Sequence, residues 1–268
     1  MKTCRRLLAL GLALCCLSGN ALAAGKKKTP TPAPVPVTPY VIEEVPETIQ
    51  GVLDLAHAEW EELEGKALKR SNKYTKWRSN YPFGWCGGFI TWLMLQFDVP
   101  MKVWTEIEEG EVPGIVHVKE AGVGKLVTGY LRMNRTTNMP QKGFIVVYGQ
   151  TGKNGLMHVG LVWDIEVLPD GRYRLTTIEG NMSNTVKMYV HDYDMNAERK
   201  TRNLSAIPQE ERTREEDRTF SYRLQDKNWY INCFLMPWVP EEYGYGPEWT
   251  APPAAETPAP TLTPAPAQ

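Results

Sequence analysis

Two proline-rich segments set the limits of the part of this chain that can fold. Residues 29–39 read TPTPAPVPVTP, and residues 251–268 read APPAAETPAPTLTPAPAQ. Proline fixes φ and lacks a backbone N–H, so such runs favour extended polyproline II and bury no core. We expect one folded domain over residues 42–239, between a linker at 24–41 and a low-complexity tail at 240–268. About 200 residues are enough for a single hydrophobic core.

The first residues have the features of a secretory signal. Three basic residues precede an apolar run over residues 7–17, and Ala21-Leu22-Ala23 follows as a small-x-small cleavage pattern. We expect residues 1–23 to be removed and the mature protein to be secreted, periplasmic or held at the cell surface. The apolar run is too short to cross a bilayer, and no later segment reaches about 18 apolar residues, so no membrane span is predicted.

Charge and ligand spacing argue against several other functions. The chain has 30 basic and 31 acidic residues, a formal net charge of −1, and no basic stripe that would favour a nucleic-acid partner. Its histidines and cysteines show no close ligand spacing, so we expect neither a metal nor another cofactor.

The order of the predicted elements indicates the α+β class. Apolar residues recur at three- and four-residue steps over residues 49–67 and 86–97, which predicts two helices. The less regular region that follows holds two short predicted helices, near 103–109 and 122–131. Apolar or alternating runs then predict strands at residues 143–149, 158–167, 173–181, 186–190 and 230–236. We therefore expect N-terminal helices packed on an antiparallel sheet.

Cys86 lies in the segment FGWCGG and opens the second predicted helix. Unpaired N–H groups and the helix dipole at such a position favour a thiolate. After signal removal only Cys86 and Cys233 remain. A disulfide is the ordinary interpretation of two cysteines in an exported protein. Cys233, however, lies in an apolar run typical of a buried strand, so we favour a free thiol at Cys86.

A cysteine nucleophile needs a nearby base, and His158 is the best placed of the four histidines. It begins a strand directly after the polar loop GQTGKNGLM. His57 falls on the flank of the first predicted helix, and we expect His117 and His191 at the surface.

The dipeptide Asp170-Gly171 predicts a hairpin whose register brings polar groups to His158. With these two residues as the loop, His158 opposes Ser183, and Val162 opposes Glu179. His158, Glu179 and Asn181 then project from the same face, because side chains alternate with period two. A loop one residue longer would break this relation. Either Glu179 or Asn181 could orient the histidine.

Three segments, KYTKW…WCGGFITWL, HVGLV and TIEGN, together resemble the CHAP domain (cysteine, histidine-dependent amidohydrolase/peptidase). This family is a relative of the NlpC/P60 and papain-like thiol hydrolases. The resemblance covers about residues 73–238 and implies a papain-like, NlpC/P60-like fold. By position it assigns the nucleophile to Cys86, the base to His158, and the polar pair that supports the histidine to Glu179 and Asn181.

The chain departs from the family pattern near each motif. Gly87-Gly88 replaces the usual alanines after the cysteine, Phe144 replaces the aspartate of a usual Gly-Asp pair, and Met157 replaces the glycine before the histidine. None of these departures removes a proposed catalytic residue.

The resemblance implies amide hydrolysis by acyl transfer. For an exported protein the implied substrate is peptidoglycan, cut between muramic acid and L-alanine, within the stem peptide or in a cross-bridge. Two alternatives remain: a non-catalytic wall- or protein-binding module on the same fold, and a cysteine protease of exported proteins. The backbone N–H of Cys86 is the natural first oxyanion donor; Asn80 and Tyr81 lie upstream at a plausible distance for a second.

Overall fold

The computed structural model describes residues 43–78, 83–110, 112–150, 155–197, 221–222 and 229–240. All of them belong to one compact unit, Val41–Gln268. The predicted signal peptide, the linker and all but the first residue of the tail lie outside the described residues, as do Asn80 and Tyr81.

Three helices lie in the described part of the chain: α1 (Glu47–Leu63), α2 (Cys86–Gln96) and α3 (Val123–Arg132). α1 begins directly after Pro46. It is followed by Glu64, which takes the left-handed conformation that closes many helices. The two long predicted helices and the short one near 122–131 are confirmed. The predicted helix near 103–109 is wrong. That segment makes one turn, and the carbonyl of Trp104 accepts a hydrogen bond from Arg132 of α3 instead.

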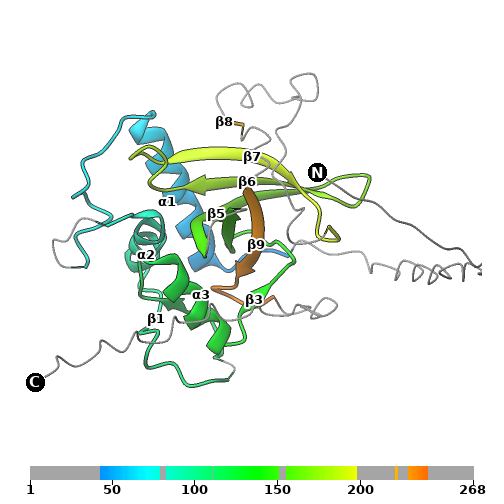
Figure 1. Ribbon diagram of the computed structural model, residues 1–268, viewed down its shortest axis with the longest axis horizontal. Coiled ribbons are helices and arrows are strands. Elements are labelled where there is room, and N and C mark those ends of the chain that lie inside the picture. Colours follow the sequence, from blue (N-terminus) through cyan, green and yellow to red (C-terminus); the bar gives the residue numbers. More distant parts are fainter. Residues whose placement is uncertain are drawn as a thin grey trace, which may run out of the picture. The chain divides into compact units, whose positions relative to one another are not determined.

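The strands of the described residues form one large, mainly antiparallel sheet and one small parallel pair. The large sheet has the order β3-β9-β4-β5-β6-β7-β8, and only β7 and β8 run parallel. Its strands are β3 (Thr136–Thr137), β4 (Ile145–Gln150), β5 (Leu156–Val167), β6 (Tyr173–Glu179), β7 (Lys187–Tyr193), β8 (Ser221–Tyr222) and β9 (Trp229–Leu235). The pair is β1 (Met101–Lys102) with β2 (His117–Val118). All three helices contact β5, and Figure 1 shows them gathered beside one side of the sheet. The α+β class is confirmed.

The β5–β6 hairpin has a longer loop than predicted. Leu168 and Arg172 close it through a backbone hydrogen bond of 2.8 Å, so three residues form the loop. Gly171 takes φ of 83°, a conformation that glycine adopts without strain. The predicted two-residue loop is therefore wrong.

A bulge compensates for the extra loop residue. The β5–β6 register shifts by one residue between Val162 and Asp164, so that Val162 faces Thr177 rather than Glu179. The predicted opposition of Val162 and Glu179 is wrong. However, the longer loop shifts the β5–β6 pairing by one residue, and the bulge shifts it by one more. The total shift of two residues returns the side chains of this part of β5 to the face on which the sequence places them. His158 and Glu179 therefore lie on the same face of the sheet.

Close packing explains the glycines that follow Cys86. A Cβ at Gly87 would lie 2.5 Å from the carbonyl oxygen of Ala121, and one at Gly88 would lie 3.1 Å from that of Tyr74. Real Cβ contacts are rarely this short, so an alanine at Gly87 would push α2 away from the start of α3. Phe144, another departure from the family pattern, is a buried core residue whose ring packs edge-on against Trp238.

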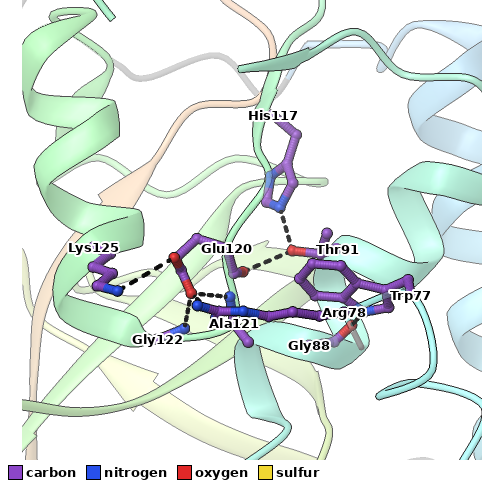
Figure 2. A network of polar contacts seen from close by, with 9 residues as sticks. All are labelled: Trp77, Arg78, Gly88, Thr91, His117, Glu120, Ala121, Gly122 and Lys125. Atoms are coloured by element: carbon purple, nitrogen blue, oxygen red, sulfur yellow. Dashed lines mark hydrogen bonds and ion pairs between the residues drawn. The ribbon is translucent and has the colours of Figure 1, made fainter. Parts of the chain in front are cut away.

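A polar network joins α2 to the segment before α3, as Figure 2 shows. The Glu120 carboxylate accepts the N–H groups of Ala121 and Gly122 at 2.8 and 3.1 Å and forms an ion pair with Arg78. Thr91 of α2 donates to the carbonyl oxygen of Glu120 at 2.8 Å. The middle of α2 is therefore tied to this segment.

His117 continues this network and is fully buried, so the expectation that it lies at the surface is wrong. Because Thr91 gives its proton to Glu120, its oxygen accepts from His117 Nε2 at 3.0 Å. The Nδ1 atom then accepts from the Tyr130 hydroxyl at 2.8 Å. Burial lowers the pKa of His117 to about 3, so the ring is neutral. His191 is also fully buried rather than exposed.

A matched pair of glycine variants tests the packing of α2. Gly87→Ala should lower the free energy of unfolding by about 1–3 kcal/mol, because its Cβ meets backbone of the next segment. Gly124→Ala, in α3, meets nothing within 4 Å and should be neutral or raise stability by up to about 1 kcal/mol. Denaturant unfolding followed by circular dichroism measures both. Equal effects of the two substitutions would contradict this account of Gly87.

The burial of neutral His117 predicts acid sensitivity. The unfolded chain takes up a proton near pH 6.5, whereas the folded state takes one up only near pH 3. Stability should therefore fall as pH drops below about 6.5, by about 2 kcal/mol at pH 5. His117→Gln should remove this part of the pH dependence. His57→Gln, at a partly exposed histidine of α1, should leave it in place, and an unchanged dependence in His117→Gln would refute the assignment.

Candidate active site

Three of the four predicted site residues come together in the structure. Cys86 is the first residue of α2, His158 lies in β5, and Glu179 is the last residue of β6. All three are buried. Asn181 follows two residues after β6, with φ of 64°, and is not among the hydrogen-bond partners of His158, which are Cys86 and Glu179.

Cys86 lies where a helix start offers its N–H groups to a negative charge. Trp85, the N-cap residue of α2, makes no capping hydrogen bond through its side chain. Burial alone would raise the pKa of the Cys86 thiol. A hydrogen bond from His158, the charge of that ring, and the backbone N–H groups of Gly87 and Val159 outweigh burial and lower it. The site therefore favours the thiolate of Cys86 more than water does. Both Cys86 and Cys233 are free thiols, as the sequence suggests.

The end of β6 explains how a strand N–H can reach the thiol. β5 pairs with β6 only from Leu161 onward, whereas its earlier residues pair with β4. Val159 therefore has no β6 neighbour, and its N–H is directed to Cys86.

His158 connects the thiol to a carboxylate. Its Nε2 atom lies 2.9 Å from Glu179 Oε2, which leaves Nδ1 for the hydrogen bond with Cys86. Burial by itself would lower the pKa of His158. The hydrogen bonds to Cys86 and Glu179 and their negative charges outweigh burial and raise it to about 9. Together with the lowered pKa of Cys86, this favours a thiolate–imidazolium pair.

Glu179 is fully buried and is held by hydroxyl groups on its second oxygen. Oε1 accepts hydrogen bonds from the Tyr148 hydroxyl at 2.7 Å and the Thr177 hydroxyl at 2.8 Å. The Tyr148 ring also stacks on His158, with centroids 5.7 Å apart and an interplanar angle of 19°. The two hydroxyl hydrogen bonds favour the ionised carboxylate and fix its position.

The sequence interpretation missed Tyr148 and Thr177. Thr177 precedes Glu179 by two residues in the same strand, so period two alone would have placed it on the same face. Tyr148 faces His158 across β4 and β5. Its only sequence signal is a hydroxyl within the apolar run GFIVVYG.

Asn181 lies beside the segment that precedes the nucleophile. Its Nδ2 lies 3.7 Å from where a Cβ on Gly84 would be. Of the two residues considered as the orienting group, the structure pairs Glu179 with His158. Asn181 lies beside the chain that leads into Cys86.

Two glycines of the motifs have a steric reason to be glycine. A Cβ on Gly160 would lie 2.7 Å from Glu179 Cγ, so HVGLV needs a glycine to leave room for the carboxylate. A Cβ on Gly180 would lie 2.5 Å from Phe89 Cβ, so TIEGN needs one to let the turn approach α2. Both motifs therefore carry packing as well as chemistry.

Met157, which stands where the family pattern has glycine, is a bulge residue. The β4–β5 register passes from Tyr148 opposite His158 to Gly149 opposite Leu156, which leaves Met157 unpaired. Its side chain is 42% exposed beside the buried site. Bulges commonly redirect side chains next to active sites, and this one precedes the residue that must face Cys86.

Neither a metal cluster nor a membrane helix is found in the part of the chain that the structure describes. There, no group of three His, Cys, Asp or Glu side chains is arranged to hold a metal ion. No helix there has the length and apolar character that a bilayer span requires.

Comparisons with known proteins add no assignment. A scan against protein-family models finds no match, and searches among curated proteins and solved structures find none. The site is therefore interpreted from its own geometry.

The reactivity of Cys86 should show its lowered pKa. The rate of alkylation by iodoacetamide should reach half its plateau well below the ordinary thiol pKa of about 8.5. Mass spectrometry locates the label. Cys86→Ala is the control, because buried Cys233 should stay unlabelled in the folded protein. A midpoint near 8.5 for Cys86 would contradict the ion pair.

Two further variants test which residue orients the histidine. Glu179→Gln removes the charge beside His158, so the midpoint for Cys86 alkylation should rise by about 1–2 pH units. Asn181→Ala should leave it within about 0.3 units, because the hydrogen-bond partners of His158 are Cys86 and Glu179 and the Asn181 amide carries no charge. The reverse order of effects would make Asn181 the orienting residue.

Proposed function

We propose that this protein is a thiol amidohydrolase that cleaves amide bonds of peptidoglycan outside the cytoplasm. The observation that carries the proposal is the buried chain of contacts from Cys86 through His158 to Glu179. This arrangement supplies a nucleophile, a base and an orienting group, which together characterise acyl transfer by cysteine hydrolases. The motif resemblance to the CHAP domain and the papain-like fold it implies belong to the same proposal.

The reaction follows from the proton positions. The Cys86 thiolate attacks the carbonyl carbon of the scissile amide, and the backbone N–H of Cys86 stabilises the oxyanion. The His158 imidazolium gives its Nδ1 proton to the leaving amine, and the C–N bond breaks to form a thioester. His158 then takes a proton from water, which attacks the thioester and releases the acid and the thiolate. Glu179 holds the ring at Nε2 throughout.

The expected export signal and proline-rich ends support a wall substrate. A secreted hydrolase with semi-rigid segments on both sides can act at a distance from an attachment point. The amide is then the bond between muramic acid and L-alanine, a bond within the stem peptide or one in a cross-bridge. A protease of exported proteins would use the same site.

Digestion of purified sacculi tests the proposal. The protein without residues 1–23 should release new amines, and Cys86→Ala should release none above background. Cys233→Ala is the matched control, because it removes the other thiol and should retain activity. Mass spectrometry of the fragments identifies the cut bond. If folded wild-type protein and Cys86→Ala release equal amounts, the hydrolase proposal fails; binding of both to sacculi would then favour a non-catalytic module.

The pH profile of hydrolysis should fall on its alkaline side near pH 9. Above the raised pKa of His158 the ring loses the proton that the leaving amine needs. The activity should therefore decrease about tenfold per pH unit well above pH 9. Glu179→Gln should move this fall to lower pH. A wild-type profile that falls near pH 6.5 would contradict the assigned ion pair.

A further inference from the structure

Tyr148 makes two separate contacts with the site, one to each member of the His158–Glu179 pair. Its hydroxyl donates to Glu179 Oε1 at 2.7 Å, and its ring stacks on the imidazole at 5.7 Å between centroids. The residue is fully buried in β4, directly opposite His158 in the strand register. One side chain therefore contacts both the carboxylate and the imidazole ring.

The strand pairing is irregular on both sides of Tyr148. The register of β4 shifts on both sides of the residue: against β9 between Val147 and Tyr148, and against β5 between Tyr148 and Gly149. The extra residues are Asn232 in β9 and Met157 in β5, so both strands that flank β4 bulge beside Tyr148.

We propose that Tyr148 is a positioning residue that keeps Glu179 ionised and fixed against His158, and that it thereby controls how much of Cys86 is thiolate. The inference rests on the proposed thiol chemistry of this site. It deepens that chemistry by adding a fourth element, β4, to the three that carry Cys86, His158 and Glu179.

The physical basis is the number of donors on a buried anion. A carboxylate that accepts two or three hydrogen bonds is strongly stabilised in its charged form, and it loses part of this stabilisation when a donor is removed. Thr177 would remain on Oε1 at 2.8 Å, and His158 on Oε2 at 2.9 Å. A carboxylate that takes up a proton more readily no longer supports the imidazolium, and the thiolate loses its counter-charge.

Other titratable groups that face this pair stay constant in the experiment. Among the residues that the structure describes, they are Cys86 of α2 and three residues of β7, namely Lys187, Tyr189 and His191. Lys187 lies opposite Glu179, Tyr189 lies opposite Thr177, and His191 packs edge-on against the Tyr148 ring. No variant below changes any of these four.

The test measures Cys86 alkylation by iodoacetamide against pH in the protein without residues 1–23. Tyr148→Phe keeps the ring and removes the hydroxyl. In this variant the rise of the Cys86 alkylation rate with pH, here called the acid limb, should move to higher pH by about one unit. Labelling well below the midpoint is then about tenfold slower than in the wild type. Tyr193→Phe is the matched control: it lies further along the same face, and its hydroxyl donates at 2.7 Å to the carbonyl oxygen of Asn138. Its acid limb should coincide with that of the wild type.

A double variant shows whether Tyr148 acts through Glu179. In the Glu179→Gln background, adding Tyr148→Phe should cause no further shift. If the double variant shows the sum of the two single-variant shifts, Tyr148 does not act through Glu179 and the proposal fails. Equal acid limbs in the wild type and Tyr148→Phe, with only a lower melting temperature in the variant, would overturn the positioning role.

A measurement on proteins that retain Tyr148 keeps the proposal testable if Tyr148→Phe does not fold. A hydroxyl proton donated to a buried carboxylate exchanges slowly and gives a downfield proton NMR signal. This signal should move upfield in Glu179→Gln, and a signal that does not respond would contradict the contact. Alkylation needs no substrate, so uncut sacculi would remove the hydrolase proposal without changing this result.

Discussion

The buried contact between His158 and Glu179 is the interaction on which the site depends. Burial by itself lowers the pKa of His158, because a charged imidazolium is unfavourable away from water. The carboxylate at 2.9 Å and the thiol on the other side reverse the balance. The charge state of Cys86 is therefore set by groups on three different elements rather than by the helix start alone.

The fold places these groups through small departures from regular sheet geometry. β6 stops at Glu179, which leaves the first part of β5 free to meet the start of α2. Gly160 leaves room for the Glu179 side chain, and Gly180 lets the following turn rest on Phe89. Gly87 allows α2 to approach Ala121. Each glycine is a point where a larger residue would separate two elements that the site needs in contact.

Sequence reasoning could reach the local features of this site but not its long-range ones. The helix beginning at Cys86 and the strand of His158 follow from periodicity, and the shared face of His158 and Glu179 follows from parity. The predicted loop was one residue too short. The prediction that His158 and Glu179 share a face still holds, because the bulge between Val162 and Asp164 shifts the pairing by one further residue. Bulges depend on neighbouring strands, which no local pattern contains. The burial of His117 depends in the same way on Thr91 and Tyr130, which are distant in sequence.

The energetics of the buried charges support the proposed chemical role of the site. Moving charged groups out of water costs several kcal/mol per ion, and apolar residues of similar volume often give equal or greater stability. A fold that needed only a core at this position could use apolar side chains on β5 and β6, as it does at Leu161 and Ile178. Instead, the hydroxyls of Tyr148 and Thr177 donate hydrogen bonds to a carboxylate beside an imidazole, which favours its charged form. In the proposed hydrolase, this charged pair supports the thiolate of Cys86 at the start of α2.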